Sequence, residues 1–226
     1  ASVDGDVVDG AGTLALSAAL SDLGIFVPQF PGAVTVDGIA RLDGAGTATV
    51  DLAATGPGGI TAQVTGDTNT SFDQLALRAT GRAPLAAANR FIVPNSVDGI
   101  LGFDLSVNGP PALSSVSGTV TTSDTRVVLP GAGINLEEVA VSVGLNGGRA
   151  DLSVTAGVQG GGAISVSGPV QLTAPFNGTL AVGLHNMVLV DPTLYRTSLS
   201  GNLRVDGPLA GGAAITGNIA VGETEI

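Results

Sequence analysis

The chain has 226 residues and a formal net charge of −11, from eight basic and 19 acidic residues. This balance excludes the basic surface that nucleic acid requires, and the absence of Cys excludes disulfides and thiolate metal sites. With 35 Gly but only six Phe, one Tyr and no Trp, the composition favours a thin, extended aliphatic layer over a thick sandwich, because large aromatic side chains dominate most globular cores.

Two segments depart from the β pattern of the chain, and the first is a predicted short helix within residues 12–25. Its leucines are spaced among Ala and Ser, and Pro28 would end it. These leucines are Leu14, Leu16, Leu20 and Leu23. A helix here would interrupt the strands near the N-terminus.

The second departure is at residues 82–89, which predict one or two helical turns. Pro84 lies near the start of this segment and Pro94 lies beyond its end, as is common for short helices. This segment is the best internal boundary in the chain. We therefore expect an upstream β-repeat segment at residues 1–81 and a C-terminal β domain at residues 82–226.

The remaining chain alternates between apolar and polar residues with a period of two. In residues 139–145 three Val and one Leu alternate with Ala, Ser and Gly, and residues 103–107 and 152–158 repeat the pattern. Successive side chains on a strand point to opposite faces, so the pattern predicts a sheet with one aliphatic face and one Ser/Thr/Asp face. We predict an all-β fold, elongated and rich in antiparallel pairs, with one or two short helical turns.

Asp-Gly and Asn-Gly dipeptides predict tight reversals at many positions, since both residues tolerate positive φ. They begin at residues 4, 9, 37, 43, 98, 108, 146, 177 and 206. A loose repeat accompanies them, in which a Gly-Pro turn is followed nine or ten residues later by a Gly-marked bend. The turns are predicted at Gly56-Pro57, Gly109-Pro110, Gly168-Pro169 and Gly207-Pro208, and the bends at Gly66, Gly118, Gly178 and Gly217. Irregular gaps between the units exclude a solenoid of fixed period.

Residues suited to catalysis or metal binding are scarce. His185 is the single histidine, the sequence contains no Gly-x-Ser-x-Gly elbow, and the alternation puts His185 on the polar face as a solvated side chain. The adjacent Glu137 and Glu138, like Glu223 and Glu225, are expected at the solvated edge of a strand, outside any calcium-loop pattern. We therefore predict a protein that is not an enzyme and that binds neither metal nor cofactor.

The aliphatic face is the remaining candidate site. If neighbouring strands add side by side into a long, curled sheet, the concave face is an apolar trough, and soluble proteins rarely expose such a patch without a ligand. Phospholipid acyl chains suit this trough, and its predicted lining residues are Leu105, Val107, Val120, Val141, Val143, Val154, Val166, Leu172, Val182 and Leu203. By itself the alternation slightly favours the other arrangement, a closed core in which these residues pack against each other.

The C-terminal part of the sequence resembles a known family. Residues 191–209 read DPTLYRTSLSGNLRVDGPL, and they are followed by Gly211-Gly212, Ile215, Gly217 and residues 222–226. Upstream, residues 83–86, 99–102 and 104–109 read APLA, GILG and DLSVNG. In this order these segments resemble the C-terminal region of the TamB family, which is related to the AsmA-like family. The resemblance covers residues 82–226 and extends to residues 1–81 in style.

The resemblance implies a fold, a location and partners. TamB-like proteins are anchored in the inner membrane of diderm bacteria, extend through the periplasm and have a curled, taco-shaped β-sheet with a hydrophobic interior. They contact the outer-membrane barrel protein TamA and are linked to phospholipid transport and to outer-membrane and autotransporter protein assembly. The family has no catalytic residues. No apolar run here spans a bilayer, and both ends lie within the alternating pattern, so we expect the chain to be part of a longer protein.

Two other functions are consistent with the sequence. One is a structural or adhesive β-repeat, such as a surface passenger domain, with a closed core and a working Ser/Thr face. The other is a chaperone edge, at which unpaired main-chain groups of the sheet bind the strands of nascent outer-membrane proteins.

Overall fold

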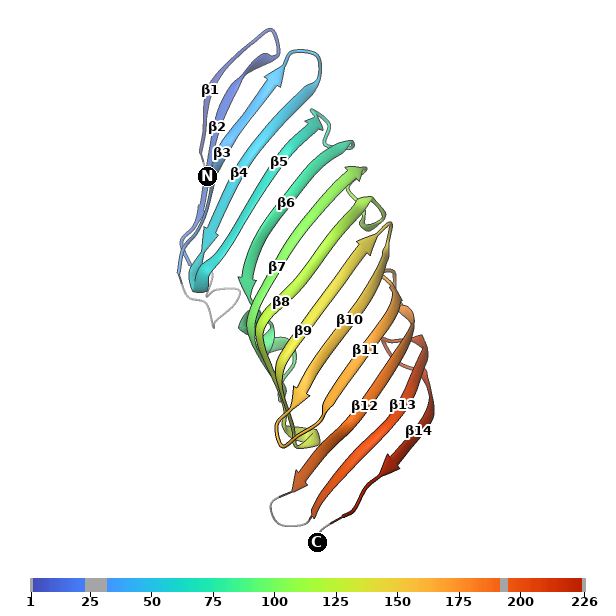
Figure 1. Cartoon of the computed structure of the whole chain (residues 1–226). Coiled ribbons are helices and arrows are strands. Elements are labelled where there is room, and N and C mark those ends of the chain that lie inside the picture. Colours follow the sequence, from blue (N-terminus) through green and yellow to red (C-terminus); the bar gives the residue numbers. More distant parts are fainter. Residues whose placement is uncertain (1, 23–31, 192–194, 225–226) are drawn as a thin grey trace.

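The computed structural model describes residues 2–22, 32–191 and 195–224, and these form one antiparallel sheet of 14 strands in chain order. Figure 1 shows an elongated, curled layer, with the N-terminal strands at one end and the C-terminal strands at the other. Within the described residues β1 pairs only with β2 and β14 only with β13, so the sheet is not closed. The predicted all-β, curled fold is confirmed.

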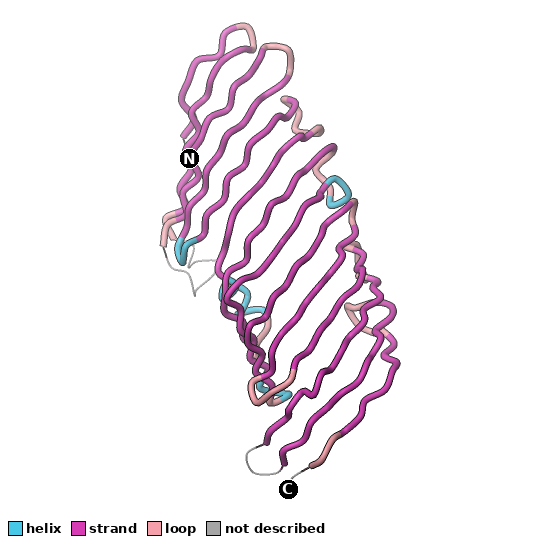
Figure 2. Tube along the Cα trace, viewed as in Figure 1, coloured by secondary structure: helices cyan, strands magenta, loops and turns pink. Residues whose placement is uncertain are grey.

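The longest strands, with 13 to 15 residues, are β7 to β9, β12 and β13. They are β1 (Ser2–Val8), β2 (Ala11–Leu20), β3 (Val34–Asp43), β4 (Thr47–Gly56), β5 (Ile60–Asn69), β6 (Leu75–Pro84), β7 (Ser96–Gly109), β8 (Val116–Leu129), β9 (Ile134–Asn146), β10 (Arg149–Val158), β11 (Ala163–Gln171), β12 (Asn177–Asp191), β13 (Tyr195–Pro208) and β14 (Ala214–Val221). The connections include the short 3-10 helices η2 (Pro57–Gly59), η3 (Leu85–Phe91), η4 (Leu113–Ser115) and η5 (Pro130–Ala132). Figure 2 shows these helices at the strand ends, leaving the two faces to the strands.

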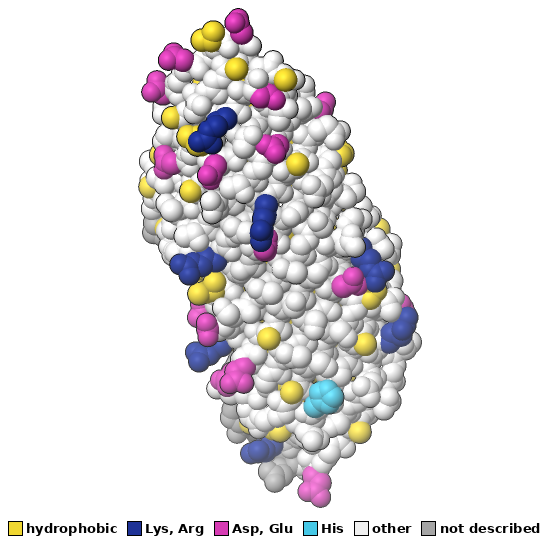
Figure 3. Space-filling view, turned by 45° about the horizontal axis from the view of Figure 1, so that its top comes forward, with side chains coloured by type: hydrophobic (Ala, Val, Ile, Leu, Met, Phe, Trp, Pro, Cys, Tyr) yellow, Lys and Arg dark blue, Asp and Glu magenta, His cyan; other side chains and the backbone are white. Residues whose placement is uncertain are grey.

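The two faces of the sheet differ in chemistry. On one face, which we call the inner face, most directly opposed residues are apolar or glycine, as in the pairs Leu52–Val64 and Val141–Val154. On the other, the outer face, opposed side chains are hydrogen-bonded, as in Ser17 to Asp37. Figure 3 shows a face on which hydrophobic side chains are few and scattered. Most inner-face residues of the internal strands are half-buried although neither a second sheet nor a long helix covers them in the described ranges, so the curl itself crowds them together.

Inner-face glycines allow the strands to approach closely. Gly118 in β8 has φ +127 and lies between Leu105 and Leu145 of the neighbouring strands, and a Cβ added to it would collide with the main-chain oxygen of Asp104. An added Cβ would collide with a main-chain oxygen in the same way at Gly5, Gly12, Gly38, Gly66, Gly168, Gly201 and Gly217. Glycine kinks of this kind introduce curvature into a sheet.

Three β-bulges curl the C-terminal half further. Register shifts locate them in β8, β9 and β12, and each contains one non-glycine residue with positive φ: Asp124, Glu138 and Asn186. A bulge adds one residue, bends the strand and increases its twist. In each case the next residue is buried on the inner face; these are Thr125, Val139 and Met187. The bulges therefore coincide with the deepest part of the inner face.

Several local predictions were wrong. Residues 11–20 form β2 instead of the start of a helix, because alternating Leu14 and Leu16 both point to the inner face; the rest of the predicted helix falls partly outside the described residues. Gly168-Pro169 is not a turn but lies inside β11, where Gly168 is one of the close-contact glycines. The predicted bend at Gly178 also lies within a strand, β12, with Pro169 and Val170 of β11 alongside it.

The dipeptide turns are correct only in part. Reversals are found at Asp9-Gly10, Asp43-Gly44 and Asn146-Gly147. At residues 4, 37, 98, 108, 177 and 206 the same dipeptides lie in strands. The glycines there kink a strand or lie at its end. The dipeptide alone therefore does not distinguish a turn between strands from a kink within one.

The helical turn predicted at residues 82–89 corresponds to η3. Residues 81 and 82 both lie within β6, which pairs with β5 and β7, so the sheet continues across this position. The division of the chain into an upstream segment, residues 1–81, and a C-terminal β domain, residues 82–226, stays a proposal.

Replacing Gly118 by Ala should destabilise the fold by about 2–4 kcal/mol, because the new Cβ adds backbone strain and a main-chain collision. Urea unfolding followed by circular dichroism measures the change. Gly144→Ala is the matched control, since Gly144 lies in β9 with open space around a new Cβ. Equal unfolding midpoints for the two variants would contradict this account of the curl.

Candidate functional site

Nine of the ten predicted lining residues lie on the inner face of β7 to β13. They are Leu105, Val107, Val120, Val141, Val143, Val154, Val166, Val182 and Leu203. The tenth, Leu172, lies just after β11, where its N–H donates to the carbonyl of Gly148. All ten are half-buried. The structure thus brings nine of them together on one surface and leaves Leu172 at its margin.

Five of these residues form one unbroken row across five strands. Val141 is opposite Val154, Val154 is opposite Val166, and the row continues through Val182 to Leu203. Directly opposed side chains in antiparallel strands are about 4.5–5.5 Å apart at Cβ and share a face. The row is therefore a continuous aliphatic strip that runs perpendicular to the strands.

The sequence analysis missed the continuation of this surface into the N-terminal half. A second row crosses from β1 to β13 without a polar side chain: Val3, Leu16, Gly38, Leu52, Val64, Ala79, Leu105, Gly118, Leu145, Ala150, Val170, Gly178 and Gly207. The period-two signal was present at Val50 and Leu52 and at Leu75 and Leu77.

The deepest part of the inner face is an aliphatic cluster in the C-terminal half. Val158, Leu184 and Met187 are buried there, with Met187 only 5% exposed. Half-buried neighbours complete the cluster; they are Ile134, Leu136, Ile164, Val182, Leu189 and Leu199. Period-two alternation could not locate this cluster, since the bulges at Glu138 and Asn186 break the phase of the alternation.

The few polar side chains of the inner face have their hydroxyls satisfied internally. Thr68 donates to the carbonyl of Asn69, and Thr125 donates to that of Ser123. Thr122 donates to the carbonyl of Val139 and accepts from the N–H of Val141. Buried polar groups without partners are absent from the described side chains. In the described ranges these threonine hydroxyl protons are therefore already used, and an apolar solute would meet a mainly aliphatic inner face.

The outer face holds the charged groups. Arg78 forms a two-pronged ion pair with Asp104 on the adjacent β7, with its Nε 2.9 Å and its Nη2 2.6 Å from the carboxylate oxygens. The hydrogen bond from the guanidinium lowers the pKa of Asp104 below its ordinary value of 3.8. Glu137 and Glu138 are exposed, as expected, but they lie at the β9 bulge inside the sheet and not at an edge.

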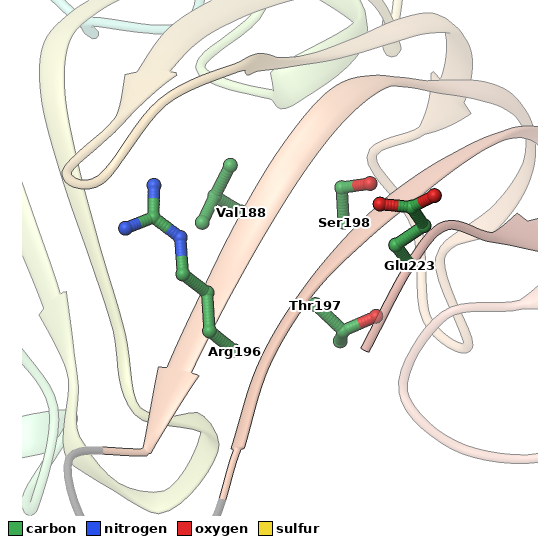
Figure 4. A pocket seen from close by; sticks show the side chains of 5 residues that line it. All are labelled: Val188, Arg196, Thr197, Ser198 and Glu223. Atoms are coloured by element: carbon green, nitrogen blue, oxygen red, sulfur yellow. The ribbon is translucent and has the colours of Figure 1, made fainter. Parts of the chain in front are cut away.

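Pockets on the described surface are shallow and separate from the predicted residues. One of them, of about 350 Å³, lies between β12, β13 and the segment after β14. Figure 4 shows Arg196 beside Val188, and Glu223 beside Ser198, around this pocket. His185 is exposed and borders another depression with Glu138 and Ser165.

The described residues contain no group of three or more His, Cys, Asp or Glu side chains arranged to hold a metal ion. Within the same ranges, no helix has the length and apolar character needed to cross a bilayer. The candidate site in the described part of the chain is therefore the inner face, whose apolar side chains form a continuous surface across the strands.

Comparison with known proteins gives one match. The family model of the TamB C-terminal domain matches residues 31–223. Searches of curated proteins and of solved structures gave no match. The matched range contains every strand from β3 to β14 and all ten predicted lining residues.

Removing the cation with Arg78→Gln should raise the pKa of Asp104 toward 3.8, which a carbon-detected NMR titration of the carboxyl measures. Because the pKa is depressed in the folded state, the pair adds stability at neutral pH and loses it as pH falls through the folded pKa, below 3.8. The stability difference between wild type and variant should therefore vanish in acid. An Asp104 pKa that is the same in both proteins would contradict the pairing.

Proposed function

Because the chain belongs to the TamB family, we propose that its inner face shields lipid acyl chains from water and lets them move along the sheet. The proposal rests on one observation above all. A continuous apolar surface crosses the whole sheet, and neither a second sheet nor a long helix covers it in the described residues. An exposed apolar patch of this extent favours a bound ligand or partner.

The dimensions of the sheet suit acyl chains. Fourteen strands spaced by about 4.8 Å give a surface roughly 60 Å long, about twice the ~30 Å hydrocarbon core of a bilayer. Each methylene removed from water on this surface is worth about 0.8 kcal/mol. A surface of this length offers room for several acyl chains in series, with the headgroups left in solvent.

The chemistry of the lining supports movement. The rows contain Val, Leu, Ala and Gly, and the threonine hydroxyls bond to nearby main-chain groups of their own sheet. A uniform apolar lining gives an acyl chain similar free energy at successive positions. We infer that the chain acts without a catalytic step, as a conduit that supports phospholipid transport to the outer membrane.

The wider setting of the proposal follows the family. In it, the chain is a periplasmic segment of an inner-membrane-anchored protein of a diderm bacterium. The full-length protein contacts TamA or a related barrel protein and supports outer-membrane and autotransporter protein assembly. The closed core expected of an adhesive β-repeat is not what the described residues form, since the sheet has two free edges.

The exposed edge of β14 favours a second function, in which the sheet pairs with strands of client proteins. All eight residues of β14 are exposed, including Ile215, Ile219 and Val221 on the inner side. The N–H of Gly222 points to β13, where it donates to Ser198, so alternation turns the N–H groups of Ile219 and Val221 to the free edge. Such an edge can add a further strand.

The lipid proposal predicts position-specific cross-linking in diderm cells. A photoreactive residue at Val143, on the inner face, should capture lipid, because its side chain lies in the apolar surface. The same residue at Ser142, on the outer face, is the matched control and should capture none. Mass spectrometry of the adducts identifies the lipid.

Lipid adducts at both positions, or at neither in the folded protein, would count against the conduit. A milder pair of variants guards against loss of folding. Val143→Thr should lower lipid capture at a probe on Val154, whereas Ser142→Thr should not.

The edge function predicts a different sensitivity. Ile219→Pro removes an outward N–H while leaving the ladder to β13 intact, so binding of an extended client strand should fall by at least about tenfold. Ile219→Ala removes the side chain and keeps the N–H, and it serves as the control. Equal client binding by the two variants, measured by fluorescence anisotropy of a labelled strand peptide, would exclude edge pairing.

A further inference from the structure

The end of η3 and the short turn after it expose two large apolar side chains. Phe91 is 72% exposed and Val93 is 76% exposed, the two highest values among the large hydrophobic side chains of the described chain. We call residues 90–94 the rim loop. Figure 2 shows η3 at the rim where β6 ends and β7 begins, so the loop lies at one long margin of the sheet.

The rim loop is held in place by Asn89 and by its own turns. The side-chain oxygen of Asn89 accepts a 2.8 Å hydrogen bond from the N–H of Val97 at the start of β7. The carbonyl of Asn89 accepts from Ile92, whose own carbonyl accepts a 2.8 Å bond from Asn95. The exposed side chains of Phe91 and Val93 therefore project from a braced loop, where hydrogen bonds fix the main chain on both sides.

A cation accompanies the apolar side chains. The guanidinium of Arg90 lies 4.6 Å from the centroid of the Phe91 ring, and Arg90 has no ion pair within the described residues. The nearest acidic residue in sequence, Asp98, is opposite Arg126 in the sheet. The loop thus combines an aromatic ring, a branched aliphatic side chain and a positive charge without a carboxylate partner.

We propose that the rim loop docks on the surface of a phospholipid layer of low net charge. Phe91 and Val93 would enter the headgroup region, and Arg90 would bind a lipid phosphate. Zwitterionic headgroups supply that phosphate without the net negative field that would repel a chain of charge −11. The proposal goes beyond the lipid conduit, because it concerns the rim of the sheet and does not require a lipid on the inner face.

The position of the loop gives the docking a consequence. Ala83, near the end of β6, is directly opposed to Leu101 of β7 on the inner face. A lipid layer bound at the rim loop would therefore meet the apolar surface at its margin. Docking there would let acyl chains pass between the layer and the inner face without crossing open water.

The chain contains no Trp, so one introduced indole reports on the loop alone. Phe91→Trp should show a blue-shifted emission and quenching by brominated lipid when vesicles of phosphatidylethanolamine and phosphatidylcholine are added. Phe72→Trp is the matched control: Phe72 is 62% exposed in the β5–β6 turn, at the opposite strand ends, and should show neither change.

Affinity variants test the same surface with the whole chain. In vesicle flotation, Phe91→Ser combined with Val93→Ser should bind at least about tenfold more weakly than wild type, and Phe72→Ser should bind normally. Arg90→Gln should weaken binding several-fold. Val154→Asp, which disrupts the inner face, should keep vesicle binding, and this separates failure of the docking from failure of the conduit.

Three results would overturn the docking proposal. These are a wild-type chain that does not float with the vesicles, equal responses of the indoles at positions 91 and 72, and unchanged binding by the double Ser variant. The first would assign the loop to a protein partner instead of a lipid layer.

Discussion

The close approach of neighbouring strands at the inner-face glycines is the constraint on which this structure depends. A single-layer sheet has no partner layer to cover its apolar side, so its Val and Leu side chains are half-buried only if the sheet bends toward them. A side chain on Gly66 or Gly118 would collide with a main-chain oxygen of the next strand. Across the strands these glycines alternate with Leu and Val. The Leu and Val side chains of the neighbouring strands can therefore lie over the glycines as the backbone curls.

The same constraint explains the openness of the surface. Curvature crowds the apolar side chains enough to make the layer stable, yet it does not close the sheet, and β1 and β14 remain edges in the described residues. The bulges at Asp124, Glu138 and Asn186 deepen the C-terminal half, where Met187 and its neighbours are buried. An apolar surface that is crowded but uncovered is the property that a conduit for acyl chains requires.

Much of the fold could be predicted from the sequence. Alternation of apolar and polar residues determined the β fold and the shared face of Val141, Val154 and Val166. The role of glycine was harder to predict, because Asp-Gly at residue 9 forms a turn while Asp-Gly at residue 37 kinks a strand, and only the strand pairing distinguishes the two. Bulges could not be located from the period-two pattern either, because one added residue reverses the phase of the alternation and only the strand pairing shows where it is added.

The predicted site left out the N-terminal strands, because all its lining residues were chosen from residues 105–203. Leucines at positions 14 and 16 fit both a helix and a strand, and the helix interpretation was wrong for residues 12–20. The register shows that these leucines extend the same row. Exposed segments such as the rim loop carry no useful periodic signal, because a short 3-10 helix and the residues after it are too short to show one.

The most direct test of the central claim is methyl NMR of the chain with a spin-labelled fatty acid. The account predicts that methyl groups of inner-face Val and Leu residues, from Leu16 to Leu203, broaden together when the fatty acid is added. The outer-face methyl groups of Val8 and Val128 should keep their intensity. Equal broadening on both faces, or inner-face methyl groups that remain sharp, would contradict an open apolar surface that binds acyl chains.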